Sequence, residues 1–324
     1  MIGVTGANGL LGRFVLEGLT SLSIPFFGIK RPTSDISHFK DLSINWKDAD
    51  ILDFTSLQEA VKGATTIIHT AALVSFKPND DELLYKTNVE GTRNLVNACL
   101  LQGVDRLIHI SSVAALGRQK GVVEIDESHK WVDSKLNSEY AESKYLAELE
   151  VYRGQEEGLK IDIVNPSVIL SQSDWDRSSS QLFKYVWRSR PFYIGGTINY
   201  VDVRDVVKII LSIIKSDSRG DRIIANAGAL SLRDFLSEVA IRFNKKPPHI
   251  LVPPSVVAFF AYLELIRSKI TGKEPIVSPQ SARNVNERFF YKNQKAIQEL
   301  GIQFQPLEDT LDWCCGYYLK KMLQ

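Results

Sequence analysis

The sequence predicts an α/β fold, a doubly wound parallel sheet followed by a smaller, mostly helical lobe. Short runs of β-branched residues alternate with helical stretches over the first 170 residues. A glycine-rich turn lies between the first strand and the first helix. The length of 324 residues also exceeds that of one typical domain. We therefore expect a first domain at 1–170 to which 199–227 returns, and a second lobe built from 171–198 and 228–324.

The expected elements follow from the apolar pattern and the turn residues. Strands are predicted at Ile2–Thr5, Pro25–Ile29, Thr66–Thr70, Arg106–Ser111 and Ile161–Asn165, with a further one near 43–46. Helices are expected to begin near Leu10, Ser56, Asp81 and Ser138, because each follows a turn or capping residue and opens an apolar repeat of helical spacing.

Composition excludes several classes of function. A net charge of +1 offers no basic stripe for nucleic acid. The three cysteines form no disulfide framework, and the five histidines lack the short spacings of metal sites, so we predict no metal. Met1 is followed directly by strand-like Ile2 to Val4, so we expect a cytoplasmic protein that acts on a small molecule. The sequence leaves open whether two copies form a homodimer.

One apolar stretch, Leu251 to Ile270, raises the question of a membrane segment. Glu264, Arg267 and Lys269 interrupt it, and it falls short of the roughly 20 apolar residues that a membrane span needs. We therefore predict a buried amphipathic helix of the second lobe rather than a membrane contact.

The glycine-rich turn is suited to binding a pyrophosphate. Glycines let backbone amides approach the phosphates, and the following helix offers the positive end of its dipole. The residues predicted to contact the cofactor here are Thr5, Gly6, Asn8, Gly9, Leu10, Leu11 and Gly12. The spacing is G-x-x-G-x-x-G, and the alternative is a tight turn with no ligand.

The end of the second strand bears on which dinucleotide binds. An acidic residue there would accept hydrogen bonds from a free ribose and repel a 2′-phosphate, but this chain has Lys30 and Arg31. Two cations suit the additional phosphate, so NADP(H) is favoured over NAD(H). Asp50 and Ile51 are predicted to lie along the adenine. The alternative is that these are solvated loop residues.

A candidate catalytic pair lies on the helix that begins near Ser138. Tyr140 and Lys144 are four residues apart and so share one helical face. A phenol with a pKa of about 10 becomes a useful acid or base at neutral pH if Lys144 and an oxidised nicotinamide lower that pKa together. Ser112, at the end of the strand Arg106–Ser111, is predicted to hold a substrate carbonyl, with Ser111 as the fallback. A surface helix and a serine-capped strand end are the alternatives.

Six segments in order resemble the extended short-chain dehydrogenase/reductase family, also called the NAD-dependent epimerase/dehydratase family. They are Thr5–Gly12, His69–Ala72, Asn88–Thr92, Ile110–Gly117, Tyr140–Lys144 and Asn165–Val168, and Tyr200–Asp205 matches more loosely. Arg31-Pro32 and the late Thr271–Pro275 are similar to the dihydroflavonol-reductase-like branch. The resemblance implies a Rossmann sheet and a reductase.

The resemblance also implies roles for single residues. Ser112 would orient the substrate oxygen, Tyr140 exchange the proton, Lys144 hold the nicotinamide ribose, and Asn88 support a proton-relay water. The cofactor would also contact Thr70, Ala71, Ala72, Ser111, Pro166, Ser167 and Val168, and Trp175 is a candidate for the substrate side. Val113 and Ala114 stand where dehydratases carry an acidic pair, which argues against a dehydratase. The segment 171–175 departs from the usual Gly-Pro turn, so no specific substrate is transferred.

We therefore predict an NADP(H)-dependent reductase or dehydrogenase that interconverts a carbonyl and an alcohol. The enzyme alternative is a nucleotide-sugar epimerase with retained NAD, which prefers an acidic residue where Lys30 and Arg31 stand. A non-catalytic NADP-binding scaffold or redox sensor is the alternative from another class, and it would not require Ser112, Tyr140 and Lys144 together.

Overall fold

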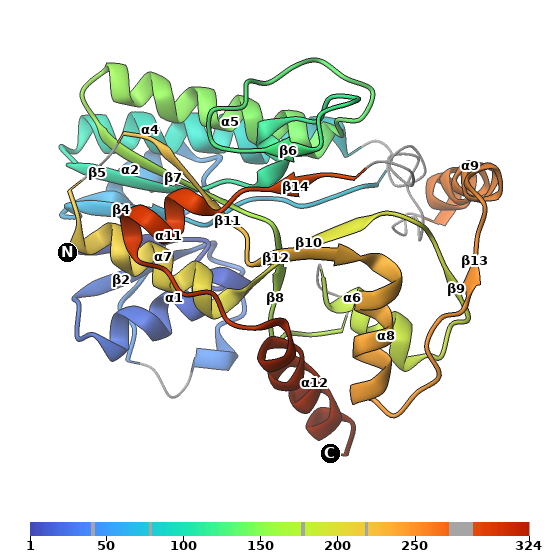
Figure 1. Cartoon of the computed structure of the whole chain (residues 1–324). Helices are drawn as coiled ribbons and strands as arrows, with labels where there is room; N and C mark the ends of the chain where they lie inside the picture. The colour runs from blue at the N-terminus through green and yellow to red at the C-terminus, as the bar shows by residue number, and fades with distance from the viewer. Residues whose placement is uncertain (40–42, 78–79, 176–178, 218–219, 272–287, 324) are drawn as a thin grey trace.

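The computed structural model describes residues 1–323 except 40–42, 78–79, 176–178, 218–219 and 272–287 (Figure 1). Residues 272–275, part of the late segment similar to the reductase branch, lie outside this described part.

A seven-stranded parallel sheet forms the centre of the first domain. Its order is β11-β7-β5-β4-β1-β2-β3, which confirms the doubly wound α/β prediction. The strands are β1 (Ile2–Thr5), β2 (Phe26–Lys30), β3 (Trp46–Asp48), β4 (Thr66–His69), β5 (Arg106–Ile110), β7 (Lys160–Pro166) and β11 (Arg222–Ala225). The strand expected near 43–46 begins only at Trp46. All pairs are parallel, and Thr5 lies opposite Ile29 and His69, so the carboxyl ends of neighbouring strands meet at one edge.

Helices cover both faces of the sheet, each over its own apolar core. Side chains of α1 (Leu10–Ser21) and α7 (Val203–Lys215) form the core on one face, together with α11 (Gln294–Leu300). On the other face the core contains side chains of α2 (Phe54–Val61), α4 (Gly91–Leu101) and α5 (Glu139–Glu156). α3 (Asp81–Leu84) continues as a π-helical turn (Tyr85–Glu90) into α4. Short 3-10 turns occupy Ser37–Phe39 and Val113–Leu116.

The second lobe has its own core. It is built around the small sheet β12-β10-β8, with β8 (Val168–Leu170), β10 (Thr197–Asp202) and β12 (Gly228–Ser231), and around α6 (Ser180–Trp187), α8 (Leu232–Arg242) and α12 (Leu307–Leu323). Two-stranded pairs join β9 (Phe192–Tyr193) to β13 (Ile250–Leu251) and β6 (Glu124–Ile125) to β14 (Phe290–Tyr291). Within the segment predicted to return, β11 joins the main sheet and α7 packs on α1, while β10 belongs to the small sheet.

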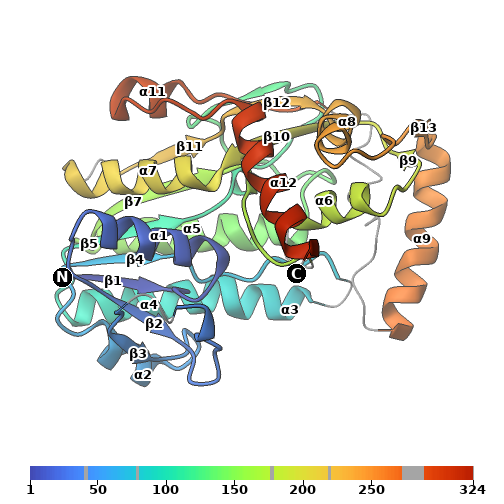
Figure 2. The ribbon, with the colours of Figure 1, turned by 90° about the horizontal axis from the view of Figure 1, so that it is seen from below.

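The prediction of a buried helix at 251–270 is wrong. The helix exists as α9 (Pro254–Thr271), at the edge of the molecule in Figure 2, but only Val257, Ala261 and Ser268 are buried. Phe259 is 61% exposed and Ile270 is 79% exposed. The apolar repeat identified a helix, but it did not reveal that α9 has apolar residues on two faces and packs through only one. None of the described helices has the length and apolarity that crossing a membrane requires.

Candidate active site

In the glycine turn between β1 and α1, the absence of side chains lets the turn approach the backbone of neighbouring segments closely. Gly6 has φ +63°, and a Cβ there would lie 2.6 Å from the backbone of Ala71. A Cβ on Gly12 would lie 2.3 Å from the Gly6 oxygen. Gly9 is the N-cap of α1, and no described side chain caps that end. The first N–H groups of α1 therefore point to a position without a side chain, which suits a phosphate group.

The end of β2 carries a paired lysine and an exposed arginine. Lys30 Nζ donates to Asp48 Oδ1 at 2.6 Å, across the β2–β3 pair, and its side chain is only 10% exposed. Arg31 follows in an exposed turn closed by the hydrogen bond from Ser34 N to Arg31 O. Sequence reasoning treated Lys30 and Arg31 as equivalent, but Asp48 offsets the charge of Lys30.

Asp50 and Ile51 lie just beyond β3, at the same edge of the sheet. Asp50 Oδ1 accepts from Leu52 N at 3.0 Å and so shapes its own turn. The Ile51 side chain packs against Gly91, at the start of α4.

The three predicted catalytic residues are brought together where β5 and α5 meet. Ser112 caps the short turn after β5, and its hydroxyl hydrogen-bonds to the half-buried Tyr140. Lys144, one helical turn further along α5, is 2% exposed and donates from Nζ to the Ile110 oxygen at 2.9 Å. The Phe76 ring meets the Tyr140 ring edge-on, with centroids 5.9 Å apart.

The charge balance at Tyr140 in the protein alone favours the neutral phenol. Burial raises the pKa of Tyr140, and the hydrogen bond from Ser112 opposes that rise. Burial also lowers the pKa of Lys144 to about 8, while the nearby Glu148 carboxyl opposes that change. The predicted fall in the tyrosine pKa is therefore not a property of the protein alone, because both side chains are desolvated and Lys144 bonds to the main chain.

Sequence reasoning missed a buried carboxylate next to this pair. Glu148 follows Lys144 by four residues on the same face of α5 and is fully buried. Its Oε1 accepts from Asn165 Nδ2 at 2.6 Å, and its Oε2 lies 3.4 Å from Arg222 Nη2. Asn165 Nδ2 also donates to the main-chain oxygen of Ser112 at 2.9 Å. Burial raises the pKa of Glu148, and Arg222 is the strongest opposing influence. The four-residue spacing of Tyr140, Lys144 and Glu148 was the sequence signal from which Glu148 could have been identified.

Asn88 lies buried in the π-helical turn, an irregularity that often marks functional sites. Its amide accepts from Leu73 N at 2.7 Å and donates to Ser143 Oγ at 2.9 Å. It therefore joins the loop after β4 to α5. Its role in a proton relay stays a prediction.

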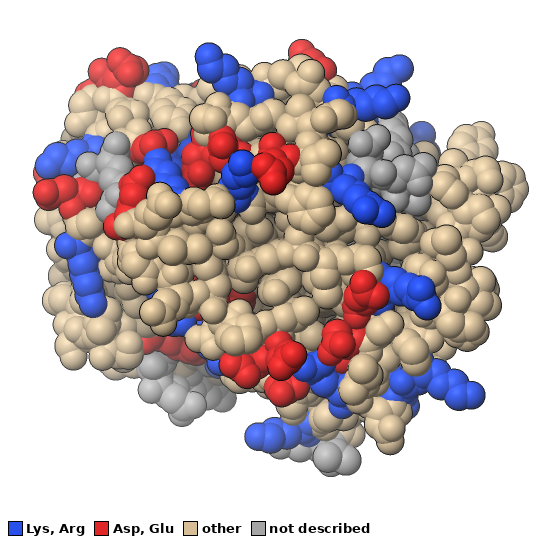
Figure 3. Space-filling view, in the orientation of Figure 1, with Lys and Arg blue, Asp and Glu red and all other residues tan. Residues whose placement is uncertain are grey.

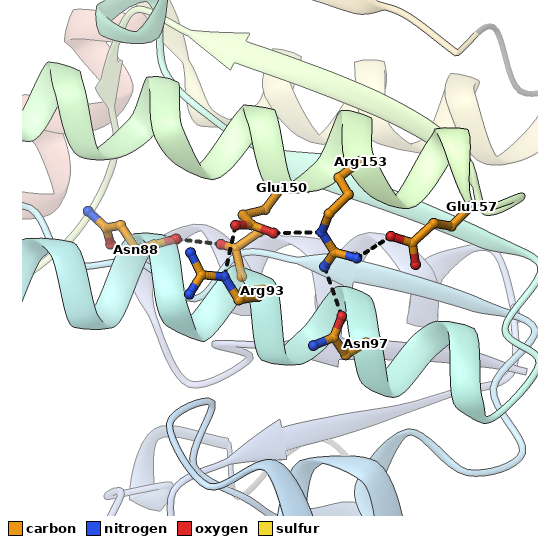
Figure 4. A network of polar contacts seen from close by, with 7 residues as sticks. Asn88, Arg93, Asn97, Glu150, Arg153 and Glu157 are labelled. Carbon is orange, nitrogen blue, oxygen red and sulfur yellow. Dashed lines mark hydrogen bonds and ion pairs between the residues drawn. The ribbon is translucent and has the colours of Figure 1, made fainter.

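An ion-pair network holds the opposite face of α5 against α4 (Figure 4). Arg93 Nε donates to Glu150 at 2.8 Å, and Arg153 bonds to Glu150, Glu157 and Asn97. These contacts fix the rotation of α5 and with it the direction of Tyr140 and Lys144.

A buried histidine pair lies between β4 and β5. The Thr92 hydroxyl donates to the Asn88 oxygen at 2.6 Å, so it accepts from His69 Nε2 at 3.1 Å. His69 Nδ1 then accepts from the Thr5 hydroxyl at 2.7 Å, which is the neutral tautomer. Burial and the Lys144 charge lower the pKa of His69 to about 3, and they also hold the pKa of His109 well below its ordinary value. Neither ring adds a cation near Lys144 at neutral pH.

A family model described as the NAD dependent epimerase/dehydratase family matches residues 2–228. The chain belongs to this family. A protein of Synechocystis sp. named "Putative dihydroflavonol 4-reductase" is 30% identical over 96% of this chain and 93% of its own length. The crystal structure of gox2253 has a TM-score of 0.85 at 30% identity and covers 99% of this chain and 98% of its own. A UDP-glucose 4-epimerase of Thermotoga maritima has a TM-score of 0.81 at 17% identity, with 99% of each chain covered, and shows the shared fold.

The site suits the nicotinamide cofactor for which this epimerase/dehydratase family is named. The open glycine turn fits a pyrophosphate. The buried Ser167 hydroxyl, just after β7, has no hydrogen-bond partner among the described side chains and backbone. Thr70 donates to the Thr5 oxygen at 2.7 Å, and Ala71 faces Gly6, so the segment Thr70–Ala72 borders the turn. These residues form one continuous edge with Pro166, Ser167 and Val168.

Trp175 is not brought to this edge. Its ring stacks on Tyr318 at 4.3 Å and also contacts Trp187 and Phe243, within the core of the second lobe. The substrate contact expected for Trp175 has no support in these contacts. The rings of Tyr318, Trp187 and Phe243 hold Trp175 in that core.

Proposed function

We propose that the chain is an NADP(H)-dependent oxidoreductase that interconverts a carbonyl and an alcohol on a small organic substrate. The observation that carries the proposal is the meeting of Ser112, Tyr140 and Lys144 at the carboxyl edge of the sheet, next to the open glycine turn. The similarity to a protein named as a reductase supports it.

The roles follow from the chemistry of each group. The bound nicotinamide supplies the hydride in the reducing direction. Ser112 holds the substrate oxygen beside the Tyr140 hydroxyl, and Tyr140 donates its proton to the developing alkoxide. Lys144, fixed by the Ile110 oxygen, stabilises the phenolate that remains, which offsets part of the burial penalty on that charge. Glu148 keeps Lys144 protonated in a site where burial favours its neutral form.

The preference for NADP(H) rests on Arg31 more than on Lys30. Arg31 is exposed at the end of β2, whereas Asp48 holds Lys30. We expect tryptophan-fluorescence titration to give tighter binding for NADP(H) than for NAD(H). Arg31→Ala should remove most of that difference, and Lys30→Ala should remove less of it. Tighter NAD(H) binding by the unaltered chain would contradict the cofactor assignment.

A panel of ketones and aldehydes, followed at the NADPH absorbance band, tests the reaction. Tyr140→Phe keeps the ring and loses the proton donor, so turnover should fall by about 10²–10⁴-fold with cofactor binding nearly unchanged. Tyr145→Phe is the matched control, because Tyr145 lies on the same helix and stacks on Trp131. Full turnover in Tyr140→Phe would refute the mechanism. Tightly held NAD released on denaturation, with no NADPH consumed, would favour an epimerase.

A further inference from the structure

Helix α9 has two apolar faces and packs through only one of them. Val257, Ala261 and Ser268 are buried and lie on one side of the helix. A second set is exposed, and it recurs every three or four residues, so it occupies about a third of the helix circumference on the other side. The members of this set are Val256, Phe259, Phe260, Leu263, Ile266 and Ile270.

Further exposed apolar residues lie on the adjoining strands. Ile250 and Leu251 of β13 pair with β9, and both are exposed, as is Phe192 of β9. We call the six exposed side chains of α9 the apolar face, because consecutive strand residues such as Ile250 and Leu251 point to opposite sides. Single exposed apolar residues are ordinary on a protein surface, but a contiguous group of this size marks a contact site.

The sequence segments that carry and precede the apolar face are rich in positive charge. Residues 188–193 and 245–271 contain one acidic residue, Glu264, which pairs with Arg267 at 2.7 Å. The same segments contain six basic residues: Arg188, Arg190, Lys245, Lys246, Arg267 and Lys269. The whole chain carries only +1, so positive charge is concentrated in these two segments. In Figure 3 the edge of the molecule where Figure 1 places α9 is largely tan.

The positive charge of these segments distinguishes between two partners for the apolar face, a second copy of the chain and a lipid bilayer. A symmetric dimer through this face would set the same basic residues of two copies against each other, which disfavours association. An exposed apolar helix face together with an excess of basic residues in the same segments matches an anionic bilayer, whose headgroups attract Lys and Arg while its acyl boundary accepts Phe, Leu and Ile.

We propose that the apolar face docks the protein on the surface of an anionic phospholipid bilayer. Helix α9 lies in the plane of the headgroups with Phe259, Phe260 and Leu263 in the acyl boundary. Arg188, Arg190 and Lys246 contact lipid phosphates. The contact is peripheral and reversible, and it is independent of the reaction proposed above.

Vesicle co-sedimentation of the full chain tests this. Vesicles of phosphatidylcholine with one third phosphatidylglycerol should bind the protein, and vesicles of pure phosphatidylcholine should bind it far more weakly. Neutralising Arg188, Arg190 and Lys246 to Gln should weaken binding about fivefold for each cation removed. Added salt should weaken binding as well.

The contribution of the apolar face to vesicle binding is tested by Phe259→Gln with Phe260→Gln. Gln is a good helix former, so α9 should remain helical while vesicle binding is abolished. Leu101→Gln with Ile241→Gln is the matched control, because Leu101 is 65% exposed and Ile241 69% exposed on other helices. This control should bind like the unaltered chain, and thermal melts should show all variants folded.

Three results would overturn the proposal. One is the absence of binding to anionic vesicles at low salt. Another is equal binding to neutral vesicles. The third is a dimer in sedimentation velocity that Phe259→Gln with Phe260→Gln dissolves, which would assign the face to a second copy of the chain.

Discussion

Replacing Glu148 with Gln removes a buried negative charge next to Lys144 while keeping the shape of the side chain. A glutamine oxygen still accepts from Asn165, and Arg222 keeps its hydrogen bond to the Tyr152 hydroxyl. The change therefore acts mainly on the protonation of Lys144. Because Glu148 opposes the burial that lowers the pKa of Lys144, its loss should lower that pKa further.

The size of the effect follows from elementary electrostatics. Opposite charges about 6 Å apart, the spacing of positions four apart on a helix, attract by about 3 kcal/mol at an effective dielectric constant of about 20. We use about 2 kcal/mol for the attraction between Glu148 and Lys144, because burial raises the pKa of Glu148 and reduces its mean charge. That amount lowers the ratio of charged to neutral Lys144 about 30-fold.

The pH profile of kcat/KM is the assay. With a Lys144 pKa of about 8, roughly three quarters of the unaltered side chain is protonated at pH 7.5, and about a tenth would be in the variant. We expect kcat/KM to fall about eightfold at pH 7.5 and less than twofold at pH 6, because the protonated form still dominates there. The loss of activity on raising the pH should therefore begin earlier in Glu148→Gln.

Glu150→Gln is the control for that comparison, because Glu150 lies on the same helix but faces Arg93 and Arg153. Superimposable profiles for Glu148→Gln and the unaltered chain would refute the role given to Glu148.

Two further predictions concern stability and cofactor binding. In the folded chain the pKa of Lys144 is about 8, below its ordinary 10.5, so the unfolded chain binds this proton more tightly. Burying the charged Lys144 therefore lowers the stability of the fold below pH 8. This loss of stability fades between pH 8 and pH 10.5. Lys144→Met should therefore be inactive yet more stable in thermal melts at pH 7, by up to about 3 kcal/mol, with the gain shrinking at alkaline pH; a less stable variant at pH 7 would contradict this. Gly12→Ala should abolish cofactor binding in fluorescence titrations, because its Cβ would meet the Gly6 oxygen at 2.3 Å. Gly316→Ala, with nothing within 4 Å, should bind normally, and equal binding by both variants would refute the close approach.

Local pattern was enough to predict the central parallel sheet and its covering helices. The strand Ile2–Thr5 and the helix starts at Leu10 and Asp81 are as predicted, because buried parallel strands and the turns that precede helices carry their signals in adjacent residues. The predicted catalytic trio also meets in space, because Tyr140 and Lys144 share a helical face and Ser112 ends a strand of the same sheet.

The remaining features depend on partners distant in the chain. The buried Glu148 carboxylate is held by Asn165 and Arg222, which lie on strands β7 and β11. Lys30 has Asp48 as a partner only because β2 and β3 pair in that register. The burial of α9 could not be read from its apolar repeat, since the repeat does not specify which apolar face meets the lobe.

Transfer of deuterium from the nicotinamide ring is the most direct test of the proposed reaction. A carbonyl compound turned over with NADPH deuterated at C4 should give an alcohol that carries the deuterium on the former carbonyl carbon, with one NADPH consumed for each alcohol formed. The account predicts this labelled alcohol from the unaltered chain and none from Tyr140→Phe. Substrate converted without net consumption of NADPH and without label, or labelled alcohol formed equally well by Tyr140→Phe, would contradict it.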